Sequence, residues 1–207
     1  MADLLRWPAA GESAGRPAVV ERVVRALRAG TLVVGPSDTV YGLLALPSSQ
    51  AATDRLERVK GRRDRFIRLA ESLESVLALA APAPEHRSAL AAIWPGPVTV
   101  VLPATPSCSQ ATVAVRVPAA PFLRDVLRRT GEALYSTSAN PPGEPVPGRV
   151  EDVAASLREA AAVIVDAGPS SSTEASTVVD LTGPRPRVLR VGAGDPGPLL
   201  DRIPHTS

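Results

Sequence analysis

The 207-residue chain has a single cysteine, Cys108, and only two histidines. One cysteine excludes an internal disulfide, and this set is too small for a Cys/His metal cage. No apolar run approaches the roughly 20 residues that a membrane-spanning helix needs. Residues 1–10 carry Asp3, Arg6 and Pro8 within their short apolar stretch, which is not the pattern of a secretory signal. We therefore expect a cytoplasmic protein with no membrane association.

Aromatic residues are also scarce, at 3%, but the other proportions are those of a folded protein, with 44% hydrophobic and 21% charged residues. A chain of this length can bury a sizeable core, and no stretch resembles an interdomain linker. We predict one domain over residues 1–207, with the motif-bearing core at about 17–192. The formal net charge of +2 is too small for a dedicated nucleic-acid-binding protein.

Lysine and asparagine are nearly absent, because Lys60 is the only lysine beside 22 arginines and Asn140 is the only asparagine. Heavy use of arginine, alanine and proline is typical of a G+C-rich coding sequence. In such a chain, arginine or aspartate would have replaced both residues had either served. Lys60 and Asn140 are therefore the first candidates for side-chain chemistry.

Strands and helices alternate through most of the chain, and strands cluster near its end. Hydrophobic periodicity predicts helices over residues 17–29, 51–59, 73–80, 85–94, 122–129 and 150–161, with a last helical turn near Leu199. It predicts strands over residues 31–34, 66–69, 98–102, 112–117, 133–136, 163–165, 176–181 and 187–191. This order favours a layered α/β fold with a mixed sheet.

Two segments place polar groups directly after regular elements. Residues 36–42, Pro-Ser-Asp-Thr-Val-Tyr-Gly, follow a predicted buried strand, where open α/β sheets bind ligands, although a plain hydroxyl-capped turn would look the same. Residues 60–65, Lys-Gly-Arg-Arg-Asp-Arg, combine the compact charge of a lysine ammonium with arginine guanidinium groups, each of which can donate two parallel hydrogen bonds. That combination suits phosphate or carboxylate, and a solvated basic face is the alternative.

Arg116 stands in a valine-rich strand. The strand period of two places Val113, Val115 and Val117 on one face, and Thr112, Ala114 and Arg116 on the other. If this arginine is covered, it needs an anionic partner, which is either a substrate or a structural carboxylate.

Three further segments complete the candidate set. Residues 136–140, Ser-Thr-Ser-Ala-Asn, end a strand with short donors and acceptors that suit a nucleotide or a simple cap. Residues 176–180 and 187–192 are explained mainly by β-propensity, with Ser176 and Arg190 as the side chains that would carry function. GxxxxGK[ST] does not occur, so the chain has no Walker loop.

Taken in order, seven motifs resemble the YrdC-like family, whose best-known members are threonylcarbamoyl-AMP synthases. The resemblance runs from about Val20 to Gly192 and matches the short form of the family, without an extra C-terminal domain. It rests on Pro-Ser-Asp-Thr-Val-Tyr-Gly (36–42), Lys-Gly-Arg (60–62), Trp-Pro-Gly-Pro-Val-Thr (94–99), Val-Ala-Val-Arg-Val-Pro (113–118), Ser-Ala-Asn (138–140), Ser-Thr-Val-Val-Asp (176–180) and Leu-Arg-Val-Gly (189–192).

The resemblance implies a twisted mixed β-sheet flanked by helices, with the ligand cleft on one face of the sheet. It also implies an enzyme that converts L-threonine, bicarbonate and ATP with Mg²⁺ to threonylcarbamoyl-AMP and pyrophosphate, for tRNA modification. Further partners would be tRNA or the transferase complex that modifies it. The implied residues are Thr39, Arg116 and Ser176 for threonine, Arg62, Thr112, Ser138, Asn140 and Arg190 for ATP, and Lys60 with Arg62 for catalysis, with no protein ligand assigned to the metal.

The sequence departs from the family in residues 63–71. Ungapped counting puts Glu71 where many relatives have a histidine that reaches threonine, and Ile67 where they have a proline. Either this loop has a deletion that shifts the register, or the threonine pocket is altered. The departure keeps open a nucleotide- or RNA-binding protein without threonine-dependent synthase activity. A carbamoyl-transfer module is a third reading.

Overall fold

One mixed β-sheet runs through the chain, whose computed structural model describes residues 2–9, 12, 14–62, 66–106, 108 and 110–203. Its strand order is β1-β8-β2-β3-β7-β4-β6-β5-β9-β10. The strands are β1 Asp3–Arg6, β2 Leu32–Gly35, β3 Gly42–Ala45, β4 Ile67–Leu69, β5 Val98–Pro103, β6 Thr112–Arg116, β7 Leu134–Ser138, β8 Ala161–Asp166, β9 Thr177–Asp180 and β10 Arg187–Arg190.

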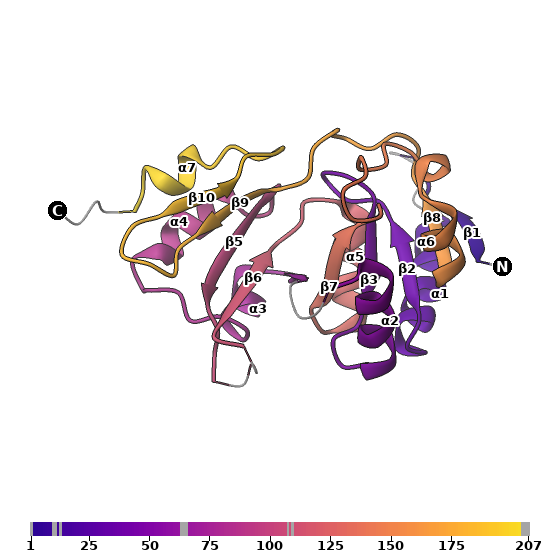
Figure 1. Ribbon diagram of the computed structural model, residues 1–207, viewed down its shortest axis with the longest axis horizontal. Coiled ribbons are helices and arrows are strands. Elements are labelled where there is room, and N and C mark those ends of the chain that lie inside the picture. The colour runs from indigo at the N-terminus through magenta and orange to yellow at the C-terminus, as the bar shows by residue number, and fades with distance from the viewer. Residues whose placement is uncertain are drawn as a thin grey trace.

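Helices flank the sheet. They are α1 Arg16–Arg28, α2 Gln50–Lys60, α3 Leu73–Leu77, α4 His86–Ile93, α5 Pro121–Thr130, α6 Ala155–Ala160 and α7 Gly197–Leu200, with a 3₁₀ turn η1 at Val150–Asp152. Figure 1 shows two halves, with β1, β8, β2, β3 and β7 beside α1, α2, α5 and α6 on the right, and β6, β5, β9 and β10 beside α3, α4 and α7 on the left. The predicted fold class, a twisted mixed sheet flanked by helices, is confirmed.

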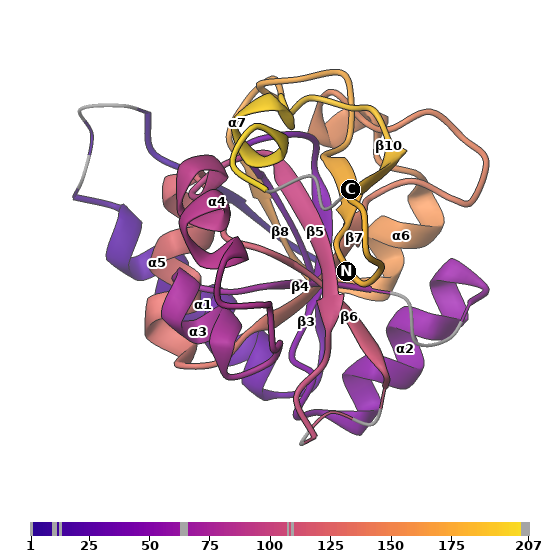
Figure 2. The same cartoon turned by 90° about the vertical axis from the view of Figure 1, so that its left-hand side faces the viewer.

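Three apolar clusters hold these layers together. One lies under α1 and α5, a second joins α3, α4 and α7 to β5, β6 and β9, and a third lies under α2 and α6. Figure 2 shows the separation, with α1, α3, α4 and α5 on one side of the view and α2 and α6 on the other. The pleat of β6 follows the predicted alternation, because Val113 and Val115 enter the second cluster while Arg116 faces the opposite way.

The strand register places Arg116 beside one of these apolar clusters. Leu69 of β4 pairs with Arg116 of β6 on one side and with Leu134 of β7 on the other. Leu69 and Leu134 belong to the cluster under α1 and α5, which therefore continues toward the face of β6 that carries Arg116. The buried arginine thus lies at the border of an apolar layer.

Most element predictions are confirmed to within a few residues, but two strands were missed and two predicted helices differ from those observed. β1 and β3 were not predicted, because an edge strand of four residues and the fully buried run Gly42–Ala45 both lack polar alternation. The predicted helix over 150–161 is interrupted, since Val153 and Ala154 adopt extended conformations between η1 and α6. The predicted helix over 73–80 ends at Leu77.

No helix among the described residues is long and apolar enough to cross a membrane.

Candidate functional site

A polar cavity lies on the face of the sheet where β3, β7, β4 and β6 meet. Three arginines enter it from separate parts of the chain, together with a series of hydroxyl groups. Its lining consists of Ser37, Thr39, Val40, Tyr41, Gly42, Arg62, Ile67, Leu69, Arg116, Leu123, Ser136, Thr137, Ser138, Ala175, Ser176 and Arg190.

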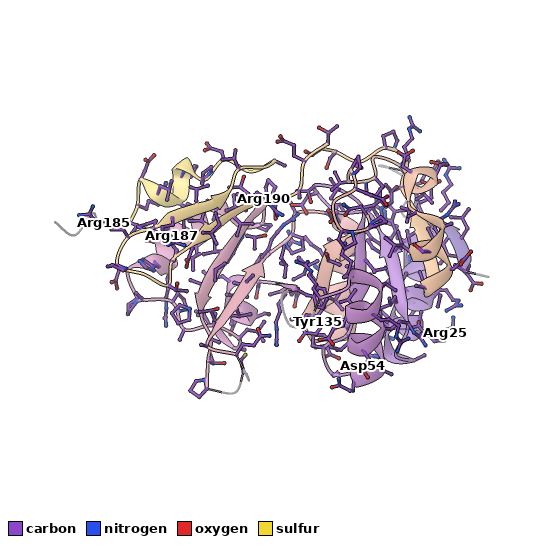
Figure 3. The ribbon with its side chains drawn as sticks, viewed as in Figure 1. Arg25, Asp54, Tyr135, Arg185, Arg187 and Arg190 are labelled. Atoms are coloured by element: carbon purple, nitrogen blue, oxygen red, sulfur yellow. The ribbon has the colours of Figure 1, made fainter. Side chains whose placement is uncertain are left out.

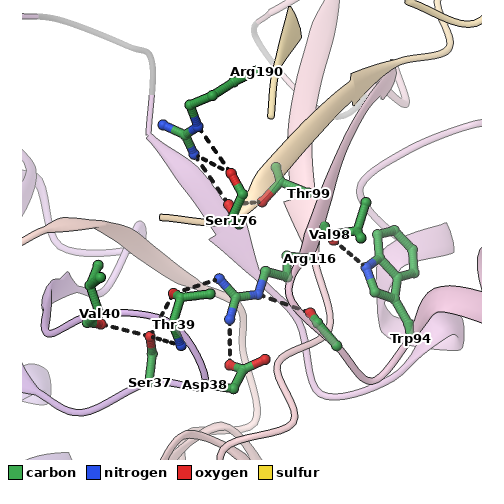
Figure 4. Close-up of polar contacts among 11 residues, drawn as sticks. Ser37, Asp38, Thr39, Val40, Trp94, Val98, Thr99, Arg116, Ser176 and Arg190 are labelled. Carbon is green, nitrogen blue, oxygen red and sulfur yellow. Dashed lines mark hydrogen bonds and ion pairs between the residues drawn. The ribbon is translucent and has the colours of Figure 1, made fainter. Parts of the chain in front are cut away.

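Arg116 is the most buried of the three arginines, with 4% of its surface exposed. Its guanidinium forms an ion pair with Asp38 and donates to Gly96 O at 3.1 Å and to Thr39 Oγ1 at 3.3 Å (Figure 4). Burial lowers the pKa of Arg116, and the Asp38 carboxylate acts in the opposite direction. The anionic partner that the strand pattern demanded is therefore a structural carboxylate, next to which the cavity opens.

The segment 37–40 is shaped by its own hydroxyl groups. Ser37 Oγ donates to Val40 O at 2.7 Å and accepts from the backbone N–H of Thr39 at 3.1 Å. This local turn presents Thr39 Oγ1 to Arg116, as Figure 4 shows. The capping alternative considered for this segment is thus present, and it serves to place the threonine.

Ser176 and Arg190 form the opposite wall. Arg190 Nε and Nη2 donate to Ser176 O at 3.0 and 2.8 Å, and Ser176 Oγ lies 2.8 Å from Thr99 Oγ1. Gly192 lets the backbone after β10 lie close to the backbone before β9, because a Cβ at this position would lie only 2.1 Å from Ala175 O. Burial, followed by the charges of Arg116 and Arg62, lowers the pKa of Arg190.

Arg62 reaches the cavity from the end of α2. Gly61, in the left-handed conformation at φ 60°, terminates the helix and turns the chain. Arg62 Nη2 then donates to Thr137 Oγ1 at 3.2 Å, and its guanidinium lies 5.3 Å from the centroid of the Phe66 ring. Three converging guanidinium groups with little carboxylate to balance them favour a polyanionic ligand.

Lys60 is buried at the last turn of α2, with 5% of its surface exposed. Its Nζ donates to Ser138 O at 3.1 Å and to Asn140 O at 2.5 Å. Burial, and secondly the charge of Arg62, lowers the pKa of Lys60 to about 8. The ammonium therefore links the end of α2 to the end of β7 and the residues that follow it.

Six of the nine predicted site residues line the cavity: Thr39, Arg62, Arg116, Ser138, Ser176 and Arg190. The other three lie outside its lining. Lys60 holds the backbone behind it, Asn140 donates through Nδ2 to Glu144 O at 2.5 Å, and Thr112 is exposed at the start of β6.

Several lining residues were not among the predicted ones. Ser136 and Thr137 come from the same run as Ser138, and strand alternation alone did not show that both faces of β7 would contribute. Ile67, Leu69 and Leu123 are apolar, so their types carried no functional signal. Asp38, which does not line the cavity, was noted only as part of its motif, although it is the ion-pair partner of Arg116.

Glu71 does not line this cavity. Its carboxylate lies 3.6 Å from Arg128 Nε on α5, and it borders a separate cavity together with Ser75 and Leu127. The side chains that β4 presents to the polar cavity are Ile67 and Leu69. β4 thus contributes apolar groups to the site.

The described residues contain no group of three or more His, Cys, Asp or Glu side chains that could hold a metal ion. The oxygen groups in the cavity lining are hydroxyls and backbone carbonyls, without a carboxylate. A divalent cation at this site would therefore take its anionic ligands from the bound molecule.

The sequence family is shown by a family model described as "Sua5_yciO_yrdC: Telomere recombination", which matches residues 25–192. The chain belongs to this Sua5/YciO/YrdC family. A Mycobacterium tuberculosis protein is 39% identical over 178 residues, which is 82% of each chain. The threonylcarbamoyl-AMP synthase of Methylobacillus flagellatus is 32% identical over 164 residues, covering 75% of this chain and 91% of that one.

A solved structure gives the same answer for the fold. The crystal structure of Pyrococcus abyssi Sua5 complexed with L-threonine is 31% identical and superposes with a TM-score of 0.81. The match covers 93% of this chain and 57% of that one, so Sua5 has a further region that this chain does not match. The predicted family is thus confirmed.

Proposed function

We propose that the chain is an L-threonylcarbamoyladenylate synthase, which converts L-threonine, bicarbonate and ATP to threonylcarbamoyl-AMP and pyrophosphate. The observation that carries this proposal is the convergence of Arg62, Arg116 and Arg190 on one cavity beside Thr39 and Ser176. The relatives named as threonylcarbamoyl-AMP synthases and the threonine-bound neighbour support the same reaction.

The substrates can be assigned to the arginines by charge. Arg116 would take the threonine carboxylate beside Thr39, because its guanidinium is already fixed by Gly96 and Asp38. Arg62 and Arg190 would bind the ATP phosphates, with the hydroxyl of Ser138 as a further donor. Asn140 and Thr112 stay predicted ATP contacts, which would require ATP to extend past the cavity lining.

The chemistry follows from this placement. Threonine and bicarbonate give the carbamate with loss of water, and one carbamate oxygen forms a bond to the α-phosphorus while pyrophosphate leaves. The nucleophile is anionic already, so the barrier lies mainly in bringing anions together. Fixed guanidinium groups lower that barrier by neutralising charge and aligning the reactants.

We propose that Mg²⁺ enters with ATP, held by the phosphates. This fits the lining, which offers hydroxyl groups without carboxylates. We also propose that the product passes to a separate transferase that modifies tRNA, in the cytoplasm.

Pyrophosphate release from ATP tests the proposal, with threonine and bicarbonate each present or omitted. We expect release only when both are present. No release from a protein that still binds ATP would overturn the synthase and favour a nucleotide-binding protein. Glu71 lies beside Arg128 and outside the cavity, which supports the synthase over that alternative.

A further inference from the structure

The floor of the cavity beside Arg116 is apolar. Ile67 and Leu69 of β4 and Leu123 of α5 all line it, and we call these three residues the apolar floor. Leu69 and Leu123 are also members of the cluster under α1 and α5, with 2% and 1% of their surfaces exposed. The hydrophobic core therefore reaches the site directly.

The register of β4 fixes where this floor lies relative to the polar groups. Leu69 pairs with Arg116 and Ile67 pairs with Ser136, so both side chains share the face of the sheet that carries those two residues. Arg68, between them, faces the other way, where its guanidinium lies 5.2 Å from the centroid of the Tyr135 ring. Ile67 and Leu69 thus occupy the sheet surface between the arginine and the serine.

This arrangement selects among α-amino acids. In an amino acid, only the α-carbon separates the carboxylate carbon from the β-carbon. A carboxylate held by Arg116 therefore places the β-substituents close to Leu69, the residue paired with that arginine. One β-substituent of threonine is a methyl group, and serine lacks it.

We propose that the apolar floor determines amino-acid specificity by packing against the β-methyl group of threonine, so that threonine is preferred to serine. The inference rests on the proposed function, because it assigns selectivity within the same reaction. One methyl group in a hydrophobic pocket is worth about 10–200-fold in discrimination. The wild-type protein should prefer threonine within that range.

The test compares kcat/KM for threonine, serine and 2-aminobutyrate, from ATP-dependent pyrophosphate release with bicarbonate present. Serine keeps the hydroxyl without the methyl group, and 2-aminobutyrate keeps the methyl group without the hydroxyl. We expect the threonine-to-serine ratio to fall at least fivefold in Leu69→Ala and in Ile67→Ala, with the KM for ATP unchanged. Ile67 is only partly buried, so its variant serves if Leu69→Ala fails to fold.

Arg68→Met is the matched control, since it changes the same strand on the opposite face, and its ratio should equal that of the wild type. Folded Ile67→Ala with an unchanged ratio would overturn the inference. Equal wild-type turnover of threonine and serine would overturn it as well, while leaving the synthase standing. No wild-type turnover with any of the three amino acids would instead overturn the proposed function.

Discussion

The only lysine of the chain donates a hydrogen bond to the backbone of the only asparagine, with Lys60 Nζ 2.5 Å from Asn140 O. A second bond to Ser138 O, at 3.1 Å, makes the ammonium a bridge between α2 and the segment from the end of β7 to Asn140. Arg62 stands two residues after Lys60, and Ser138 lies in the bridged segment. Lys60 thus fixes the separation between two residues of the cavity, and we expect it to act as a positioning residue.

Replacing Lys60 with methionine should damage both the fold and the use of ATP. The variant leaves two carbonyls without their charged donor, so the free energy of unfolding should fall by about 2–3 kcal/mol, as measured by urea denaturation. The kcat/KM for ATP should fall at least tenfold in protein that is folded, as measured by pyrophosphate release. Lys60→Arg retains the charge and donors and should recover most of the ATP use. Loss of stability with normal ATP kinetics would show that Lys60 stabilises the fold but does not position the ATP-binding residues.

The pKa of Lys60, lowered to about 8 by burial and by Arg62, predicts a pH dependence. As pH rises from 7 to 9, the folded protein loses this positive charge, so the KM for ATP should rise. The protein should nevertheless become more stable over this range. The unfolded lysine titrates near 10.5, so between about pH 8 and 10.5 the unfolded state holds more protons and the free energy of unfolding rises.

Lys60→Arg is the comparison for both measurements, since arginine keeps its charge over this range. Its KM for ATP should stay flat between pH 7 and 9, and its stability should lack the rise seen in the wild type. Identical pH profiles for the two proteins would contradict the assignment to Lys60.

Much of the fold could be predicted because its elements carry their signals locally. Gly61 ends α2 and the valines of β6 alternate, so the helix end and the face of Arg116 followed from the sequence. The run Gly42–Ala45 is buried on both faces, and such a strand has no periodicity to read. Its neighbours in the sheet, β2 and β7, could be identified only from the folded chain.

The sequence singled out residue types that are rare or costly to bury, namely Arg116, which lines the cavity, and Lys60, which lies behind it. The site was not predictable for Ile67, Leu69 and Leu123, because leucine and isoleucine are ordinary core residues. Counting without gaps had placed Glu71 at the site. The register of β4 instead presents Ile67 and Leu69 to the cavity. Glu71 comes after Leu69, the last residue of β4, so the strand alternation does not extend to its side chain.

Arg190 and Arg187 lie on the same strand and offer a matched pair for the phosphate site. Arg190 lines the cavity and holds Ser176, whereas the Arg187 side chain is 72% exposed. Figure 3 shows Arg187 farther toward the outer end of β10. Arg190→Gln should weaken ATP binding by about 10-fold or more, since it removes a charge-assisted contact. Arg187→Gln should change it less than twofold in calorimetric titration, and equal losses would point to a diffuse charge effect.

The ion pair of Asp38 with Arg116 should be visible in stability as well as in threonine use. Asp38→Asn leaves a buried guanidinium without its counter-charge, so we expect a loss of about 3 kcal/mol in the free energy of unfolding. The KM for threonine should rise while that for ATP stays within twofold. The double variant Asp38→Asn with Arg116→Gln should be less destabilised than the sum of the single variants, because the two side chains are in direct contact. Additive losses would show that the pair is not coupled.

For Glu71, ungapped counting along the family motif and the structure predict different effects of a substitution. If it occupied the place of a threonine-binding histidine, Glu71→Gln would change the KM for threonine markedly. In the structure its carboxylate lies near Arg128, and the two side chains are 44% and 59% exposed. Such a pair contributes about 0–1 kcal/mol, so Glu71→Gln should melt close to the wild type. Its KM for threonine should remain within twofold of the wild-type value, and a larger change would mean that the carboxylate reaches the substrate after all.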